Sequence, residues 1–225
     1  MAKGIFITAT GTDVGKTYIS ALLVRSMLNA GLNCGYYKPA LSGAVFLNGK
    51  LQPGDCNYVV KTSGLEVEPC ECVSYVFESA VSPHLAAQIA GEKISIEKIK
   101  KDFTRKLEQH DFMVVEGAGG IVCPFDMEDK LLLADVIKAL ALDIVVVASA
   151  ELGTINSTVL TVEYARSKDI NVRGIVLNRY NEYDAMHRDN KNCIEKLTGV
   201  KVIATVSVDA EDIVIDDIEE IFGEI

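Results

Sequence analysis

Residues 10–17, TGTDVGKT, have the composition of a phosphate-binding loop. They follow a short apolar run, residues 4–9, and lead into a helical stretch that begins at Lys16. Small residues allow a backbone to approach an anion, and the free N–H groups at a helix N-terminus bind phosphate oxygens. Lys16 would then reach the β- and γ-phosphates of a nucleotide, and the Thr17 hydroxyl would ligate Mg²⁺. The usual pattern starts with glycine, where this chain has Thr10, and the alternative is an incidental helix start.

Charged residues end two other predicted strands. Glu116 follows the apolar run 112–115 and precedes the small residues 117–120, GAGG. A carboxylate in that position suits a metal ion, and glycines permit close approach of a ligand. Lys38 ends a second strand, where it would point into the same crevice, and Asp55 begins a helix beyond the next loop. The alternatives are an exposed glutamate, a surface lysine and an acidic N-cap.

A fourth segment, LGTINST at residues 152–158, follows the apolar run 144–148 and starts a helix. The free N–H groups of that helix start could bind a carboxylate. The structural alternative is that Thr154 only caps its helix.

Alternating strands and helices must position these residues. Strands are expected over residues 4–9, 33–38, 73–77, 112–115, 144–148, 174–177 and 201–206. Helices are expected over residues 16–30, 82–90, 95–110, 155–168 and 185–197, from residue 55 onward and in the acidic C-terminal tail, with 40–54 as loop. Several strands are almost entirely apolar, which is typical of strands covered on both faces. The pattern predicts a parallel, doubly wound α/β sheet in one domain over residues 1–225.

Composition excludes several classes of protein. The chain has 225 residues, of which 49% are hydrophobic and 24% charged, as expected for a globular protein with a core. A net charge of −10 argues against binding to nucleic acids. The most apolar stretch, residues 131–150, carries Asp135, Lys138 and Asp143, which argues against a membrane span. Six cysteines without a Cys-x-x-Cys pair indicate reduced thiols and a cytoplasmic location.

Together these segments resemble the dethiobiotin synthetases, ATP-dependent ligases of biotin biosynthesis. The resemblance covers about residues 4–208 and rests on TGTDVGKT, YKPALSG, GDCNYV, SPH, VEGAGG, LGTINSTVLT and VLNRY in that order. It implies a single P-loop NTPase-type domain with a mainly parallel sheet. It also implies that CO₂, ATP and Mg²⁺ close a ureido ring on 7,8-diaminononanoate, through a carbamate and a carbamic–phosphoric anhydride.

The resemblance also implies roles for individual residues. Lys16 and Lys38 would lie beside the transferring phosphoryl group and the carbamate, which Thr12 and Ser42 would bind. Mg²⁺ would be held by Thr17, Asp55 and Glu116. Asn178 would read the nucleotide base. The remaining nucleotide contacts would come from Asp13, Val14, Gly15, Tyr18, Gly117, Ala118 and Gly119.

The same resemblance implies a homodimer with shared sites. The helix start at Gly153, Thr154, Ile155 and Asn156 would bind the substrate carboxylate in the site of the other subunit. One departure concerns the base pocket, because Ser207 stands where many members have proline. ATP is expected as co-substrate, although this change leaves the choice of nucleotide open.

Three alternatives belong to other classes. A ParA/MinD-type ATPase switch would have a second lysine in the loop, where this chain has Gly11, and it usually carries a membrane or DNA surface. A glutamine-fed amidoligase would need a glutaminase partner, for which the chain has no room. A small-molecule kinase would need an arginine-bearing lid, and only Arg179 and Arg188 lie in a suitable stretch.

Overall fold

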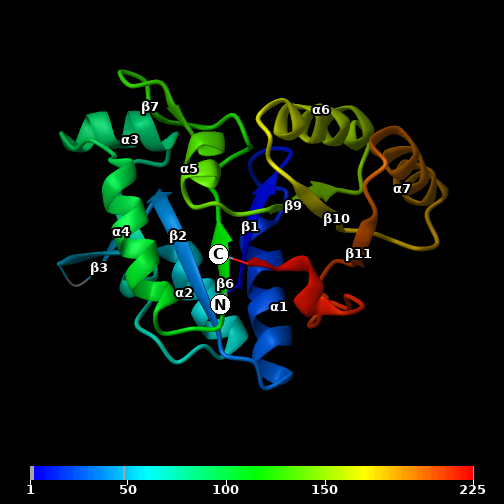
Figure 1. The fold of residues 1–225 in the computed structure, drawn as a ribbon, viewed down its shortest axis with the longest axis horizontal. Coiled ribbons are helices and arrows are strands. Elements are labelled where there is room, and N and C mark those ends of the chain that lie inside the picture. The colour runs from blue at the N-terminus through cyan, green and yellow to red at the C-terminus, as the bar shows by residue number, and fades with distance from the viewer. Residues whose placement is uncertain (1–2, 48, 225) are drawn as a thin grey trace.

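A computed structural model describes residues 3–47 and 49–224 of the chain (Figure 1). An eight-stranded sheet forms its centre, with seven parallel strands in the order β11-β10-β9-β1-β6-β2-β5 and β12 antiparallel to β1. The strands are β1 (Lys3–Ala9), β2 (Cys34–Ser42), β5 (Val73–Phe77), β6 (Phe112–Glu116), β9 (Ile144–Ser149), β10 (Val172–Asn178), β11 (Val202–Val206) and β12 (Gly223–Glu224).

Helices cover both faces of the sheet (Figure 1). One face packs against α1 (Lys16–Asn29), α2 (Gly54–Ser63) and the C-terminal segment. The other packs against α3 (Pro83–Ala90), α4 (Ile96–Leu107), α5 (Leu133–Ala139), α6 (Thr154–Ser167) and α7 (Ala185–Thr198). This confirms the predicted doubly wound α/β architecture.

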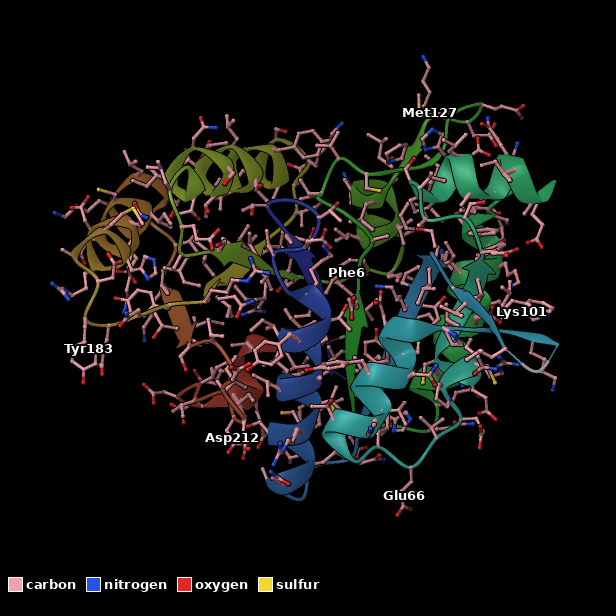
Figure 2. The ribbon with its side chains drawn as sticks, turned by 180° about the vertical axis from the view of Figure 1, so that it is seen from behind. Phe6, Glu66, Lys101, Met127, Tyr183 and Asp212 are labelled. Atoms are coloured by element: carbon pink, nitrogen blue, oxygen red, sulfur yellow. The ribbon has the colours of Figure 1, made fainter. Side chains whose placement is uncertain are left out.

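Strand β1 shows why its sequence is nearly all apolar. Successive side chains of a strand point to opposite faces, so Ile5 and Ile7 join the core under α1 while Phe6 joins the other core. Figure 2 shows Phe6 in the middle of the molecule, whereas Glu66, Lys101 and Tyr183 lie at its outside. Both faces of β1 are therefore buried, and the strand is a firm base for the loop that follows it.

The order of the strands places the predicted motifs at one edge. Strands β1, β6 and β2 are neighbours and parallel, so their carboxyl ends meet at the same side of the sheet. The chain leaves β1 towards α1 and the strand order reverses around β1, which is where ligands bind in open α/β sheets. The loop after β1, Lys38 in β2 and Glu116 at the end of β6 consequently converge.

Strand β2 is longer than predicted. The prediction ended it at Lys38, before Pro39, but the strand continues to Ser42. Proline cannot donate a hydrogen bond within a sheet. The pairing of β2 with β6 ends at Tyr37, and the register with β5 runs from Lys38 to Ser42 but leaves out Pro39. Proline therefore costs no ladder bond here, and the strand carries Ser42 to the edge of the sheet.

Further differences concern short elements. Residues 40–54, predicted as loop, contain the end of β2 and a hairpin of β3 (Val45–Leu47) and β4 (Lys50–Gln52). The hairpin β7 (Pro124–Asp126) and β8 (Leu131–Leu132) and helix α5 were not predicted. The C-terminal tail was wrongly predicted as a helix, since it forms only a 3₁₀ turn at Ile218–Ile221 and β12. Among the described residues, no helix is both long and apolar enough to cross a membrane.

Candidate active site

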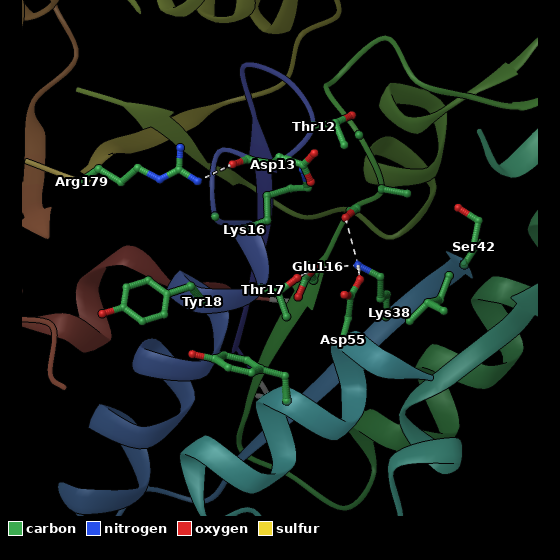
Figure 3. A pocket seen from close by; sticks show the side chains of 17 residues that line it. Thr12, Asp13, Lys16, Thr17, Tyr18, Lys38, Ser42, Asp55, Glu116 and Arg179 are labelled. Atoms are coloured by element: carbon green, nitrogen blue, oxygen red, sulfur yellow. Dashed lines mark hydrogen bonds and ion pairs between the residues drawn. The ribbon is translucent and has the colours of Figure 1, made fainter. Parts of the chain in front are cut away.

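A cavity of about 600 Å³ opens at the carboxyl ends of β1, β2 and β6 (Figure 3). It is lined by Thr12, Asp13, Gly15, Lys16, Thr17, Tyr18, Lys38, Ala40, Leu41, Ser42, Asp55, Tyr58, Glu116, Gly117, Ala118, Gly119 and Arg179. The structure thus brings together most of the residues predicted to act in catalysis, nucleotide binding or metal binding. Val14, Asn178 and the start of α6 do not line this cavity.

The loop after β1 bends sharply to expose its backbone. Asp13 and Gly15 have left-handed backbone conformations, with φ of 60° and 99°, and Gly15 is the N-cap of α1. A Cβ atom on Gly15 would clash with the side-chain amide of Asn178, so this position requires glycine. Lys16, 8% exposed, donates from Nζ to the Gly11 carbonyl at 3.0 Å. Burial, followed by the positive charge of Lys38, lowers the pKa of Lys16, although Glu116 opposes the shift.

Glu116 is the centre of a buried network. Its side chain is completely buried, and Oε1 accepts hydrogen bonds from Thr17 Oγ1 at 2.8 Å and from Lys38 Nζ at 2.5 Å. Oε2 accepts from the Tyr36 hydroxyl at 2.7 Å. Burial, reinforced by the negative charge of Glu116, raises the pKa of Tyr36 well above its usual value, so the phenol remains a donor. A buried carboxylate requires such donors, and here both of its oxygens have them.

Tyr36 is a site residue that sequence reasoning missed. It lies two positions before Lys38 in β2, and alternate residues of a strand share a face. The spacing of Tyr36 and Lys38 was the signal that could have identified Tyr36. In a mostly apolar strand, however, a tyrosine is expected to be a core residue.

Lys38 joins Glu116 to the helix that carries Asp55. Its Nζ lies 2.9 Å from Asp55 Oδ2 and 2.5 Å from Glu116 Oε1, and the side chain is 3% exposed. Burial alone would lower the pKa of Lys38, but the two carboxylates outweigh it and raise the pKa above its usual value. Lys38 is therefore a fixed positive charge. Asp55 does not cap its helix, because the N-cap of α2 is Pro53.

The donor set fits Mg²⁺ bound together with nucleotide phosphates. Thr17, Asp55 and Glu116 offer hard oxygen atoms, and Mg²⁺ commonly takes one or two carboxylates with the rest of its shell from water and phosphate. Thr17 and Glu116 are already in contact at 2.8 Å. Throughout residues 3–47 and 49–224 there is no cluster of three or more His, Cys, Asp or Glu side chains suited to a metal, so a dedicated all-protein site is not formed.

The Glu116 network should also stabilise the fold. We expect Glu116→Gln to lower the free energy of unfolding by about 3 kcal/mol, because it removes one partner of a buried ion pair. Glu163→Gln is the matched control, since Glu163 pairs with Arg166 at 2.7 Å on the exposed surface of α6. The control should cost less than about 1 kcal/mol in urea unfolding. Equal losses for the two variants would contradict the network's importance.

Asn178 lies behind the phosphate loop. It is buried at the end of β10 and donates from Nδ2 to the Val14 carbonyl at 2.9 Å. A second cavity of about 510 Å³ adjoins it, lined by Arg179, Tyr180, Asn181, Glu182, Tyr183, Thr205, Ser207 and Val208. Ser207 thus lines the second cavity together with Arg179. Recognition of the base by Asn178 stays a prediction.

The start of α6 differs from the alternative in which Thr154 only caps the helix. Its N-cap is Gly153, with φ of 94° and no side-chain hydrogen bond, and Thr154 is the first helical residue. Thr154 is buried with its Oγ1 3.4 Å from Thr158 Oγ1, whereas Asn156 is exposed. The interpretation of Thr154 as a mere N-cap is therefore wrong. Binding of a carboxylate by residues 153–156 stays a prediction.

Comparisons with known proteins agree with the site. A family model described as an AAA domain matches residues 3–211. The chain is 54% identical over 192 residues, 85% of each chain, to the ATP-dependent dethiobiotin synthetase BioD of Clostridium botulinum strain 657 / Type Ba4. It is 48% identical over 204 residues, 90% of this chain and 89% of the relative, to that of strain Eklund 17B / Type B.

Solved structures resemble the chain in fold alone. A ParA family ATPase from Chlorobium tepidum superposes with a TM-score of 0.59 at 13% identity, covering 94% of this chain and 87% of the other. A chain of the MinC:MinD cell division protein complex of Aquifex aeolicus gives a TM-score of 0.57 at 17% identity, covering 92% of this chain and 81% of the other. Identity this low carries the P-loop fold but not the activity. The sequence identity to these BioD relatives over most of the chain, together with the site described above, shows that the chain belongs to the dethiobiotin synthetase family.

Proposed function

We propose that the chain closes a ureido ring on 7,8-diaminononanoate with CO₂ and ATP, giving dethiobiotin, ADP and phosphate. The observation that carries the proposal is the pair of buried lysines, Lys16 and Lys38, on one cavity beside a phosphate loop. Lys16, the first of them, would bind the phosphates of a nucleotide. The second offers a fixed positive charge for another anion, and a carbamate is such an anion.

In the first step one amine of the substrate attacks CO₂ and loses a proton, which gives a carbamate. Thr12 and Ser42 line the cavity and would donate hydrogen bonds to the carbamate oxygens. Lys38 would orient the group and offset its charge. Holding the reacting groups in one geometry is itself a large part of catalysis.

In the second step a carbamate oxygen attacks the γ-phosphorus and ADP leaves, so that a carbamic–phosphoric anhydride forms. Phosphoryl transfer depends on positioning and on neutralising charge at the phosphoryl oxygens. Lys16 would act on the β- and γ-phosphates from the loop, and Lys38 from the opposite side. Asp13, Val14, Gly15, Tyr18 and residues 117–119 would hold the nucleotide. Mg²⁺ held by Thr17, Asp55 and Glu116 supplies further neutralisation when bound.

In the third step the second amine attacks the carbonyl carbon, loses a proton and expels phosphate, which closes the ring. The carbamate has a good leaving group only after ATP has phosphorylated its oxygen. Ring closure is therefore coupled to the use of ATP. No further residue is needed to activate the carbonyl, because the anhydride already does so.

The substrate carboxylate lies at the far end of an apolar chain and needs a separate anion site. We infer that residues 153–156 of a second subunit provide it in a homodimer, because the free N–H groups of a helix start bind anions. The same residues do not line the cavity of their own chain.

All six cysteines are free thiols, which suits the reducing cytoplasm that we propose as the location.

The rival function is an ATPase switch, and diamine dependence separates the two. With ATP, Mg²⁺ and bicarbonate, release of ADP should require an amine substrate that can form the carbamate, and no ring should form when either amine of the diamine is absent. Turnover that ignores the diamine would reject the ligase and favour the switch.

A further inference from the structure

Arg179 lines both cavities but has no part in the reaction described above. It directly follows Asn178 at the end of β10, and its exposed side chain reaches towards Asp13 (Figure 3). Arg179 is one of the two arginines in a stretch suited to a kinase lid, but it lies against the phosphate loop. The hydrogen bond between this exposed arginine and the backbone of the phosphate loop therefore needs another explanation.

Arg179 and Asn178 hold two successive carbonyls of the loop. Arg179 Nη2 donates to the Asp13 carbonyl at 3.0 Å, and Asn178 Nδ2 donates to the Val14 carbonyl at 2.9 Å. In a trans peptide the C=O and the following N–H point in opposite directions. The two bonds therefore turn the N–H groups of Val14 and Gly15 away from the end of β10.

Backbone conformation at the contact is unusual on both sides. Asp13 has φ of 60° and Arg179 has φ of 57°, which lie in a left-handed region that residues other than glycine rarely adopt. Such conformations persist where surrounding contacts over-determine them, and they gather at functional sites. Left-handed residues within a loop also direct successive N–H groups into a concave anion-binding nest. The hydrogen bond joins the two strained residues to each other.

We propose that Arg179 is a positioning residue of the phosphate loop. By binding the Asp13 carbonyl it keeps the N–H of Val14 directed at bound phosphate, while Asn178 does the same for Gly15 through the Val14 carbonyl. The proposal rests on the proposed binding of a nucleotide in this cavity. It does not depend on the identity of the second substrate.

The test compares Arg179→Asn with Arg188→Asn. Asparagine tolerates positive φ, so it removes the guanidinium without adding backbone strain. Arg188 is the matched control because it is also exposed, lies in the following helix and donates to a backbone carbonyl, that of Glu182. Glu182 lines the second cavity, but among the described residues Arg188 itself lines neither cavity and makes no hydrogen bond to the phosphate loop. Both variants lose the same charge. Arg179→Lys keeps the charge but lacks the planar fork of donors.

Binding should be measured calorimetrically with ADP and with tripolyphosphate. Tripolyphosphate has no base or ribose, so it isolates the loop from the second cavity. We expect Arg179→Asn to weaken both ligands about 10-fold, Arg179→Lys to recover only part of the loss, and Arg188→Asn to bind as wild type. An affinity of Arg179→Asn within twofold of wild type, or an equal loss in Arg188→Asn, would overturn the proposal.

Nuclear magnetic resonance of the nucleotide-free protein separates positioning from direct contact with phosphate. Loss of the bond should shift the carbonyl carbon of Asp13 and the amide nitrogen of Val14 in Arg179→Asn but not in Arg188→Asn. Weaker ligand binding with both signals unchanged would show that Arg179 acts on phosphate directly and would overturn the positioning role. None of these measurements uses ring closure, so a failure of the proposed reaction would leave them interpretable.

Discussion

Lys38→Gln should lower the turnover of the complete reaction by about 10²–10³-fold, because it removes a preorganised charge from the transferring group. Affinity for ADP should stay within a few-fold of wild type, since Lys38 approaches the cavity from β2 and not from the phosphate loop. The Lys38 ammonium is fixed between Glu116 and Asp55, so its charge needs no reorganisation when the phosphoryl group moves. Turnover and ADP binding, measured on the same preparation, check the expectation.

Lys16→Gln and Lys106→Gln complete the comparison. Lys16 belongs to the loop, so its loss should lower both turnover and ADP affinity. Lys106 is also a buried lysine, but its partner is Glu71 at 3.7 Å and it does not line the cavity. Lys106→Gln should keep wild-type turnover. A Lys38→Gln enzyme within a few-fold of wild type would remove Lys38 from the mechanism.

Mixing two inactive variants should restore activity if each site spans two subunits. Lys16→Gln damages the phosphate loop, and Asn156→Asp adds a negative charge beside the proposed carboxylate site, so each should be nearly inactive alone. In a mixed dimer one site carries both lesions and the other carries none. Random exchange makes half of the dimers mixed, so activity should recover to about a quarter of wild type.

Lys16→Gln mixed with Lys38→Gln is the matched control. Both lysines line the cavity of the same chain, so every site of that mixed dimer keeps one lesion and no activity should return. If subunit exchange is confirmed and the Lys16→Gln and Asn156→Asp mixture also stays inactive, the carboxylate site is not shared as proposed.

Local patterns explain how much of the site could be predicted from the sequence. The phosphate loop and Glu116 stand at the ends of buried strands, Lys38 lies in β2 just beyond the end of its pairing with β6, and parallel strands bring such positions together. The Glu116 contact with Tyr36 joins residues 80 positions apart in the chain, and no local signal reports it. The bond from Arg179 to Asp13 likewise spans 166 positions.

The mistaken elements were those that depend on tertiary contacts. The C-terminal tail is acidic and was predicted as a helix, but Phe222 packs edge-on against Phe112 at 5.4 Å between ring centres, and β12 pairs with β1. Packing against the sheet therefore outweighs the weak helical preference of the tail. Strand β2 passes through Pro39 for a similar reason, because its neighbours demand no bond at that residue.

The most direct test of the proposed reaction follows the carbon of CO₂. Purified protein is incubated with the diamine, ATP, Mg²⁺ and bicarbonate labelled with ¹³C, and the product is analysed by mass spectrometry. The account predicts dethiobiotin heavier by one mass unit, with one ADP released for each ring closed. Release of ADP without labelled dethiobiotin would contradict it.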